Sequence, residues 1–246
     1  MKFQGPLQSY GTDSHFETRH TDDHPSKGAV IGLIAAALGI RREETVKLQE
    51  LRNLHIIFRV DQVGQMSKEF QIAAKYKKTG DHERNYVTYR YYLEDAVFLV
   101  ALEGEDDLTK RIYEALKRPY FQLFYGRRSC PVNYDFLLGL YAGAAFDQIR
   151  EWPWIAADWY RKRRAGQEKI RLDVYGDAAC IPEASQRALR RDQPISFSQM
   201  GRQHEQRFES HKNIWIANPD YVTPDIQTEH DAFTALMEEE YVSEQS

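Results

Sequence analysis

The strongest hydrophobic pattern in the chain is an uninterrupted apolar run, AVIGLIAAALGI, at residues 29–40. The run is far shorter than the ~20 residues that a membrane-spanning helix needs. It is apolar on every side, which is typical of a helix buried against a sheet. Ser26 precedes the run as a good N-cap, and Gly39 is a good C-terminal stop. The pattern therefore predicts a buried and capped core helix.

The beginning of this helix is polar and cationic, with Ser26 and Lys27 next to free backbone N–H groups. Such a helix start can hold a phosphate, because the unpaired amides and the helix dipole both favour an anion. A capped core helix without a ligand explains the same residues, and it is the preferred interpretation for the helix body. The phosphate-binding interpretation applies to Ser26 and Lys27 alone.

Shorter apolar runs predict the other elements of the first half of the chain. Strands are expected at residues 2–4, 54–61, 96–103 and 121–124. A helix capped by Asp107 is expected at residues 108–117. With a hairpin inserted after the second strand, this order is the split βαβ pattern of a ferredoxin-like domain. The predicted fold class is therefore α+β, with this domain at residues 1–132.

The remaining sequence, residues 133–246, has a weaker pattern and is expected to form a smaller, β-rich part. Strands are expected at residues 170–175 and 213–217, and the stretch at 136–154 is apolar and helix-prone. The charged segment at 187–194 is turn-like. Residues 159–164 (WYRKRR) form a basic run, and residues 229–246 form an acidic tail.

The inserted segment, residues 62–90, differs in composition from its surroundings. Lysines and arginines are interleaved there with aromatic residues, and Gly80 and Asp81 mark a turn. Single-stranded RNA binding uses cations for phosphates and rings for unstacked bases. An exposed β-hairpin with ordinary solvated lysines explains the pattern equally well. The candidate RNA-binding residues of this segment are Lys75, Tyr76, Lys77, Tyr89 and Arg90.

A second cationic segment, YGRRSCP at residues 125–131, follows the strand expected at 121–124. The glycine before the two arginines and the proline after them predict a tight loop. Its backbone amides and guanidinium groups suit phosphates or base edges. The alternative is a surface turn with two solvated arginines, but the compactness of the motif favours binding. The candidate residues are Gly126, Arg127, Arg128 and Ser129.

Composition and charge exclude several other classes. The net charge of −4 means that any nucleic-acid partner must meet local basic patches. The only two cysteines, Cys130 and Cys180, have no metal-site spacing and are expected to be reduced thiols. Neither a signal peptide nor a membrane span is recognisable, so a cytoplasmic protein without a membrane partner is expected.

Three histidines in the polar segment before the core helix, His15, His20 and His24, suggest a metal site together with Asp22 and Asp23. The nearby aspartates and a proline argue for a loop, and no second cluster supports a metal. A solvated loop is the preferred interpretation, so neither a metal nor a cofactor is expected.

Four segments together carry a resemblance to a known family. They are residues 5–11 (GPLQSYG), 25–28 (PSKG) with the apolar run after them, 92–96 (YLEDA) and 126–131 (GRRSCP). With them, the chain resembles the CasD subunits of type I-E CRISPR Cascade complexes, members of the RAMP superfamily. The similarity extends to about residue 216, through DQPISF at 192–197 and the segment at 202–207. GPLQSYG and GRRSCP are specific in combination, whereas each is weak alone.

The resemblance implies a ferredoxin-like (RAMP/RRM-like) domain with a projecting β-hairpin thumb. It implies a non-catalytic subunit that binds the 5′ handle of the CRISPR RNA (crRNA) and caps the complex in antiviral defence. The implied partners are the crRNA, the CasC backbone subunits, the large CasA subunit and, through the complex, target DNA. Family members have more residues in their first strand, so a trimmed or misannotated start is expected here.

Two other functions stay open at this point. A metal-independent endoribonuclease that processes CRISPR repeat RNA, as a related subunit does in type I-C systems, needs a base, an acid and a cation at one site. His82, Lys78 and Tyr86 are conceivable for it but show no spacing logic. A metal hydrolase would use the three histidines named above.

Overall fold

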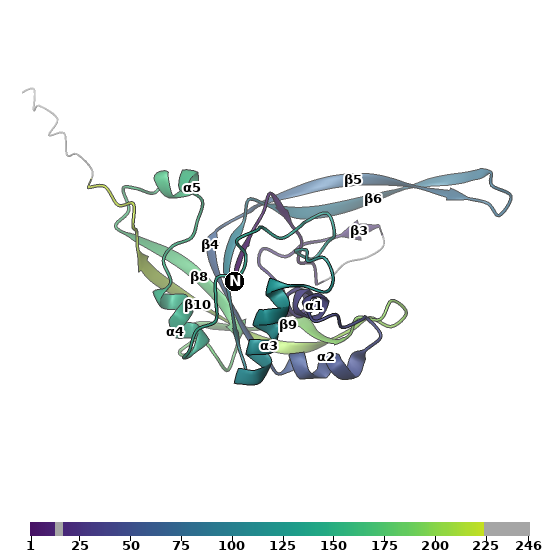
Figure 1. Ribbon diagram of the computed structural model, residues 1–246. Helices are drawn as coiled ribbons and strands as arrows, with labels where there is room; N and C mark the ends of the chain where they lie inside the picture. Colours follow the sequence, from purple (N-terminus) through teal and green to yellow (C-terminus); the bar gives the residue numbers. More distant parts are fainter. Residues whose placement is uncertain (13–16, 224–246) are drawn as a thin grey trace, which may run out of the picture.

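The computed structural model describes residues 1–12 and 17–223, and its main feature is a six-stranded antiparallel sheet (Figure 1). The strand order is β1-β7-β4-β8-β10-β9. The strands are β1 (Lys2–Gln4), β4 (His55–Gln62), β7 (Val97–Glu103), β8 (Lys169–Asp177), β9 (Gln186–Ser196) and β10 (Gln203–Ala217). Because β4 pairs with β7 on one side and β8 on the other, one sheet joins residues from both halves of the chain. The expected division of the chain into two parts, 1–132 and 133–246, therefore stays a prediction.

Helices cover the two faces of this sheet. The face bearing Ile56 and Phe58 packs in one core with α1 (Lys27–Ala37), α2 (Thr45–Arg52) and α3 (Asp106–Lys117). Ile57 points to the opposite face and packs with α4 (Ala145–Glu151), as alternation along a strand requires. A short helix, α5 (Asp158–Lys162), lies beyond β8 and β10 (Figure 1).

The core helix predicted from the apolar run is confirmed as α1. The Ser26 side chain accepts a hydrogen bond from the Ala29 N–H, so it is the N-cap. Gly39 follows the C-cap with φ +74°, a left-handed conformation that glycine adopts without strain. Val30, Ile31 and most other side chains of the helix are buried.

The predicted hairpin is also confirmed, as β5 (Gln65–Tyr76) and β6 (His82–Glu94), and it projects far from the body (Figure 1). Two short strands, β2 (Leu7–Gln8) and β3 (Thr18–Arg19), pair with the base of β6. The segment that connects them contains residues 13–16, which the structure does not describe. The base of the hairpin is therefore tied to the N-terminal segment, whereas its tip is not.

Other expectations need correction. The strand expected at 121–124 is reduced to one isolated bridge, between Phe124 and Pro131. The Lys2 N–H instead donates to the Phe136 carbonyl, at 2.7 Å. The neighbouring strands β1, β7 and β4 thus supply three of the four strands expected.

Three local predictions were also wrong. The charged segment at 187–194 belongs to strand β9, where its inward-facing charges find partners from other elements. The apolar stretch at 136–154 is helical only in α4. Helix α3 has Glu105 at its N-cap, without a side-chain capping bond, in place of Asp107. His15 and the acidic tail expected at 229–246 lie outside the described residues.

Candidate RNA-binding site

The loop that contains the two adjacent arginines is held against the GPLQSYG segment. Gly126 has φ +78°, and a Cβ atom at this position would lie 1.6 Å from the Ser9 carbonyl oxygen. Only glycine fits so close an approach. The Ser9 N–H donates to the Tyr125 carbonyl at 3.2 Å, and the Cys130 N–H donates to the Arg127 carbonyl at 2.9 Å, so the loop is closed on both sides. GPLQSYG and GRRSCP, the two motifs that are specific in combination, are therefore one structural unit.

Arg127 points from this loop to the base of the hairpin. Its guanidinium lies over the Tyr92 ring, 4.7 Å from the ring centroid, and its Nη2 donates to the Arg19 carbonyl at 2.9 Å. Its Nη1 is buried without a hydrogen-bond partner in the described part of the chain. Arg128 and Ser129 are exposed beside it. One guanidinium is thus fixed in place with one buried, unpaired nitrogen, and a second is free in solvent.

The hairpin has two different faces. Phe70 stands opposite Tyr89, and Ile72 stands opposite Val87, on a face that is apolar and exposed. The alternate positions form a polar face that carries cations and leads along β6 to Tyr92. The cations of that face are Lys75, Arg84 and Arg90. Because Arg127 packs on Tyr92, the polar face of the hairpin continues into the arginine loop.

The sequence-predicted hairpin residues divide between its two ends. Arg90 lies near the base, and its Nε is buried without a partner among the described residues. Tyr89 is exposed near the base, with the Lys68 ammonium over its ring at 4.0 Å. Lys75 forms an ion pair near the tip, and Tyr76 and Lys77 are exposed there. Arg90 therefore shares the polar face with the arginine loop, Tyr89 lies on the opposite face of the hairpin base, and the tip lies apart from both.

The structure places Ser26 and Lys27 in the interior, which corrects the phosphate-contact expectation. The Lys27 side chain is 5% exposed, and its Nζ donates to Asp177 at 3.0 Å. The Lys27 backbone N–H donates to the Asp192 carboxylate at 2.7 Å. Burial lowers the pKa of the Lys27 ammonium, and the Asp177 carboxylate offsets part of that shift. The helix start already binds a carboxylate of the same chain, so Ser26 and Lys27 are not part of the candidate RNA-binding surface.

A buried network of charges surrounds this helix start, and sequence reasoning missed it. Arg207 bridges Asp192, Asp177 and Glu209. Burial raises the pKa of Glu209, but the hydrogen bond from His24 and the charges of nearby arginines outweigh it and lower the pKa to about 2. The network holds the N-terminus of α1 to β8, β9 and β10. No sequence signal indicated it, because its members come from segments far apart.

The histidines expected as a possible metal set have other roles. The His24 Nε2 lies 3.1 Å from Glu209, and the His24 ring stacks on Tyr175 with centroids 4.0 Å apart. His20 stacks on the Tyr91 ring at 5.1 Å, beside the hairpin. Within the described residues, no three His, Cys, Asp or Glu side chains form a group that could hold a metal ion. His20 and Arg19 were not predicted for the RNA site, and only the pairing of β3 with β6 brings them there.

Comparison with known proteins identifies the family. A family model described as "CRISPR-associated protein (Cas_Cas5)" matches residues 1–208. The chain belongs to this Cas5 family. It is 32% identical over 155 residues to the "CRISPR system Cascade subunit CasD" of Escherichia coli (strain K12), which covers 56% of this chain and 69% of that relative. The resemblance to CasD is thereby confirmed.

Solved structures are similar to the whole described Cas5 fold. A chain of a "CRISPR RNA-guided surveillance complex" matches with a TM-score of 0.74 and 25% identity, over 96% of this chain and 98% of that chain. A "Crystal structure of Cas protein" matches with a TM-score of 0.58 and 29% identity, over 90% and 96% of the two chains. The chain is thus a Cas5/CasD-like subunit with a mixed α/β fold.

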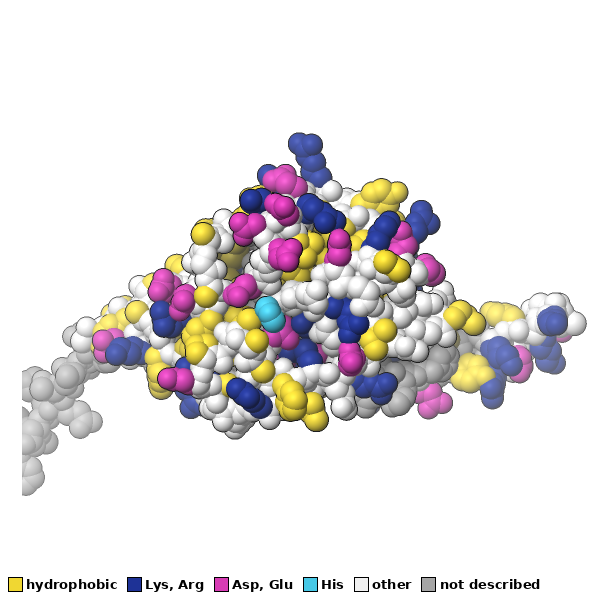
Figure 2. Space-filling model, turned by 90° about the horizontal axis from the view of Figure 1, so that it is seen from below, with side chains coloured by type: hydrophobic (Ala, Val, Ile, Leu, Met, Phe, Trp, Pro, Cys, Tyr) yellow, Lys and Arg dark blue, Asp and Glu magenta, His cyan; other side chains and the backbone are white. Residues whose placement is uncertain are grey.

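The surface charge of this Cas5 chain is mixed. Figure 2 shows acidic and basic side chains interspersed over the face seen from below, with further Lys and Arg side chains on the projecting hairpin. Because the charges are mixed, an RNA-binding surface must be local, as the net charge requires.

Among the described residues, no helix is long and apolar enough to cross a membrane.

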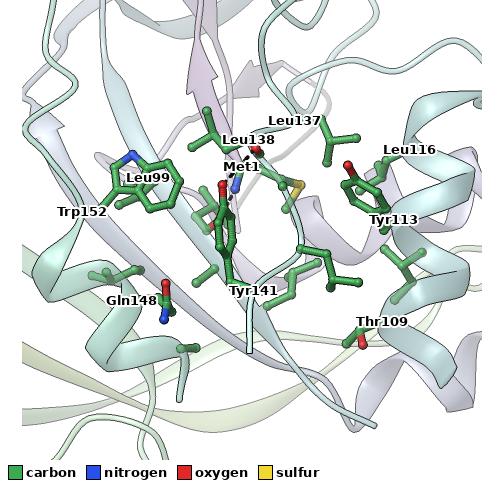
Figure 3. A pocket seen from close by; sticks show the side chains of 18 of the residues that line it. Met1, Leu99, Thr109, Tyr113, Leu116, Leu137, Leu138, Tyr141, Gln148 and Trp152 are labelled. Atoms are coloured by element: carbon green, nitrogen blue, oxygen red, sulfur yellow. Dashed lines mark hydrogen bonds between the residues drawn. The ribbon is translucent and has the colours of Figure 1, made fainter. Parts of the chain in front are cut away.

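One concavity of this Cas5 chain is unsuited to RNA. It is an apolar cleft of about 120 Å³ at the edge of β7, between α3 and α4. Figure 3 shows Trp152 and Tyr141 on one side of it and Tyr113 and Leu116 on the other. The Met1 amine in it donates to the Val100 carbonyl, and burial lowers the pKa of that amine to about 5. A cleft without a charged side chain has nothing to bind a phosphate.

Proposed function

We propose that this Cas5 chain is a non-catalytic subunit of a CRISPR RNA-guided surveillance complex, that it binds the 5′ handle of the crRNA and that it caps the complex. Membership of the family and the similarity to a chain of such a complex support the assembly. The observation that carries RNA binding is the continuity between the Arg127 loop and the polar face of the hairpin. CasC-like and CasA-like subunits, and target DNA through the complex, are the proposed further partners, in the cytoplasm.

Each part of this surface has a role in the proposal. Arg128 and the partly exposed guanidinium of Arg127 would contact handle phosphates, and Gly126 and Ser129 would add backbone donors. Exposed Tyr89, on the other face of the hairpin, would stack on a splayed base. We interpret β1, β7 and β4 with α1 and α3 as the ferredoxin-like part, within residues 1–132. The hairpin is the thumb of that part.

The direct test is replacement of both loop arginines by alanine. At ~1–3 kcal/mol per charge-assisted contact, the variant Arg127→Ala/Arg128→Ala should bind handle RNA more weakly by about 2–4 kcal/mol. The slope of log K against log salt should also fall, because fewer counterions are released. A filter-binding titration at several salt concentrations measures both quantities.

A matched control separates the loop from overall charge. Arg41 and Arg42 are also adjacent and exposed, and they follow the opposite end of α1. Arg41→Ala/Arg42→Ala removes the same two charges and should bind RNA nearly as the parent protein does. Equal losses of RNA affinity in both variants, or no loss in Arg127→Ala/Arg128→Ala, would refute the assignment of RNA binding to the arginine loop.

The non-catalytic part of the proposal needs its own experiment. His82, considered above for a ribonuclease, has its Nε2 2.8 Å from the Asn85 side-chain oxygen, at the exposed tip of the hairpin. Repeat RNA incubated with the pure protein in EDTA and separated on a gel should stay intact. Cleavage that disappears in His82→Ala would establish the endoribonuclease in its place.

A further inference from the structure

A small cavity of about 210 Å³ lies at the base of the hairpin, between the GPLQSYG segment and α5. Its lining includes Gln4, Pro6, Gln62, Asp95 and Trp159. The volume is below the roughly 300–1,000 Å³ of sites that hold drug-sized ligands. It suits a single flat ring better than a whole nucleotide.

Asp95 is the unusual residue of this cavity. It has φ +55°, a left-handed conformation that costs a residue with a Cβ atom more than glycine. The strained backbone is held from both sides: the Asp95 N–H donates to the Pro6 carbonyl at 3.4 Å, and Gln62 Nε2 donates to the Asp95 carbonyl at 2.5 Å. Glycine would adopt this backbone conformation with less strain than Asp95 does. The Asp95 carboxylate is exposed and has no hydrogen-bond or ion-pair partner among the described residues.

Trp159 supplies the aromatic wall of the cavity. It is 47% exposed, which is unusual for a large indole without a partner surface. The Arg163 guanidinium lies over its ring at 5.1 Å and brings positive charge next to the cavity. A ring to stack on, a free acceptor and a neighbouring cation are the groups that hold an unstacked nucleobase and its phosphate.

We propose that this cavity binds one RNA base that carries an exocyclic amino group, which Asp95 accepts while Trp159 stacks on the ring. The proposal rests on the RNA-binding function proposed above and adds a base-specific subsite to it. Asp95 is three residues beyond Tyr92, or about 10 Å at the rise of a strand. One RNA strand on the Arg127 loop can therefore reach the cavity. A carboxylate accepts from an amino group and repels a carbonyl, so cytosine is favoured over uracil.

The experiment compares labelled oligo(C) and oligo(U) RNAs of equal length, which differ in that amino group, by fluorescence anisotropy on the full chain. The parent protein should bind oligo(C) about five- to tenfold more tightly. Asp95→Gly, which relieves the backbone strain, should bind both RNAs equally and keep its thermal stability. Trp159→Ala should lose about tenfold on oligo(C). Trp215→Ala removes another exposed tryptophan, on β10, and should bind as the parent does.

The outcomes separate the two proposals. If the Arg127→Ala/Arg128→Ala variant loses binding but Asp95→Gly keeps the preference of the parent, the subsite is wrong and the RNA-binding function stands. Equal binding of oligo(C) and oligo(U) by the parent protein also overturns the subsite. If the parent protein binds neither RNA, the subsite is wrong, and the titration with handle RNA decides the RNA-binding function.

Discussion

Replacing Lys27 by methionine tests whether this lysine belongs to the fold or to the RNA surface. Methionine keeps the length and apolar stem of the side chain and removes only the ammonium. The ion pair between Lys27 and Asp177 is buried on both sides, with side chains 5% and 10% exposed. The substitution therefore leaves a buried carboxylate without its nearest cation.

The expected loss follows from what Asp177 retains. Breaking a buried ion pair by removing one partner costs roughly 3–5 kcal/mol. Asp177 keeps the Ile56 N–H at 2.9 Å and the more distant Arg207 guanidinium at 3.4 Å. These contacts reduce the penalty, so we expect the free energy of unfolding to fall by about 2–4 kcal/mol. The double variant Lys27→Met/Asp177→Asn removes the stranded charge and should recover part of that loss.

Urea denaturation of the three proteins, followed by circular dichroism, measures the effect as a lower midpoint at constant slope. Handle RNA binding, measured well below the midpoint, should be unchanged in Lys27→Met. An unchanged midpoint together with weaker RNA binding would place Lys27 at the RNA and refute the reasoning from burial.

Two further predictions concern the loop and the buried network. Gly126→Ala should lower both stability and RNA binding, since its methyl group meets the Ser9 carbonyl; the control Gly201→Ala has nothing within 4 Å of its new Cβ and should change neither. The pKa of Glu209 is lowered from 4.5 to about 2, so its stabilisation is complete above pH 4.5 and is lost as the pH falls from 4.5 towards 2. At 1.36 kcal/mol per pKa unit, that loss is about 3 kcal/mol. Urea midpoints between pH 7 and pH 3 should therefore fall less steeply in Glu209→Gln than in the parent, and parallel curves would contradict this assignment.

Local patterns in the sequence were sufficient for several elements. The apolar run, its Ser26 cap and the terminating Gly39 predicted α1, because capping and burial depend on residues close in the chain. The glycine-marked turn and the mixed composition of residues 62–90 predicted the hairpin for the same reason. The family resemblance likewise came from short motifs. The charged strand β9 was missed because residues from other elements neutralise its buried charges.

The tertiary structure decided which cations are available to a ligand. Lys27 and Arg127 both follow a small polar motif that suggests an anion site. Lys27 lies against Asp177, 150 positions away in the chain, and is buried. Arg127 lies on Tyr92 at the hairpin base and stays partly exposed. Whether a cation is neutralised inside the fold or left for a partner depends on contacts between distant segments, and only the folded chain brings those segments together.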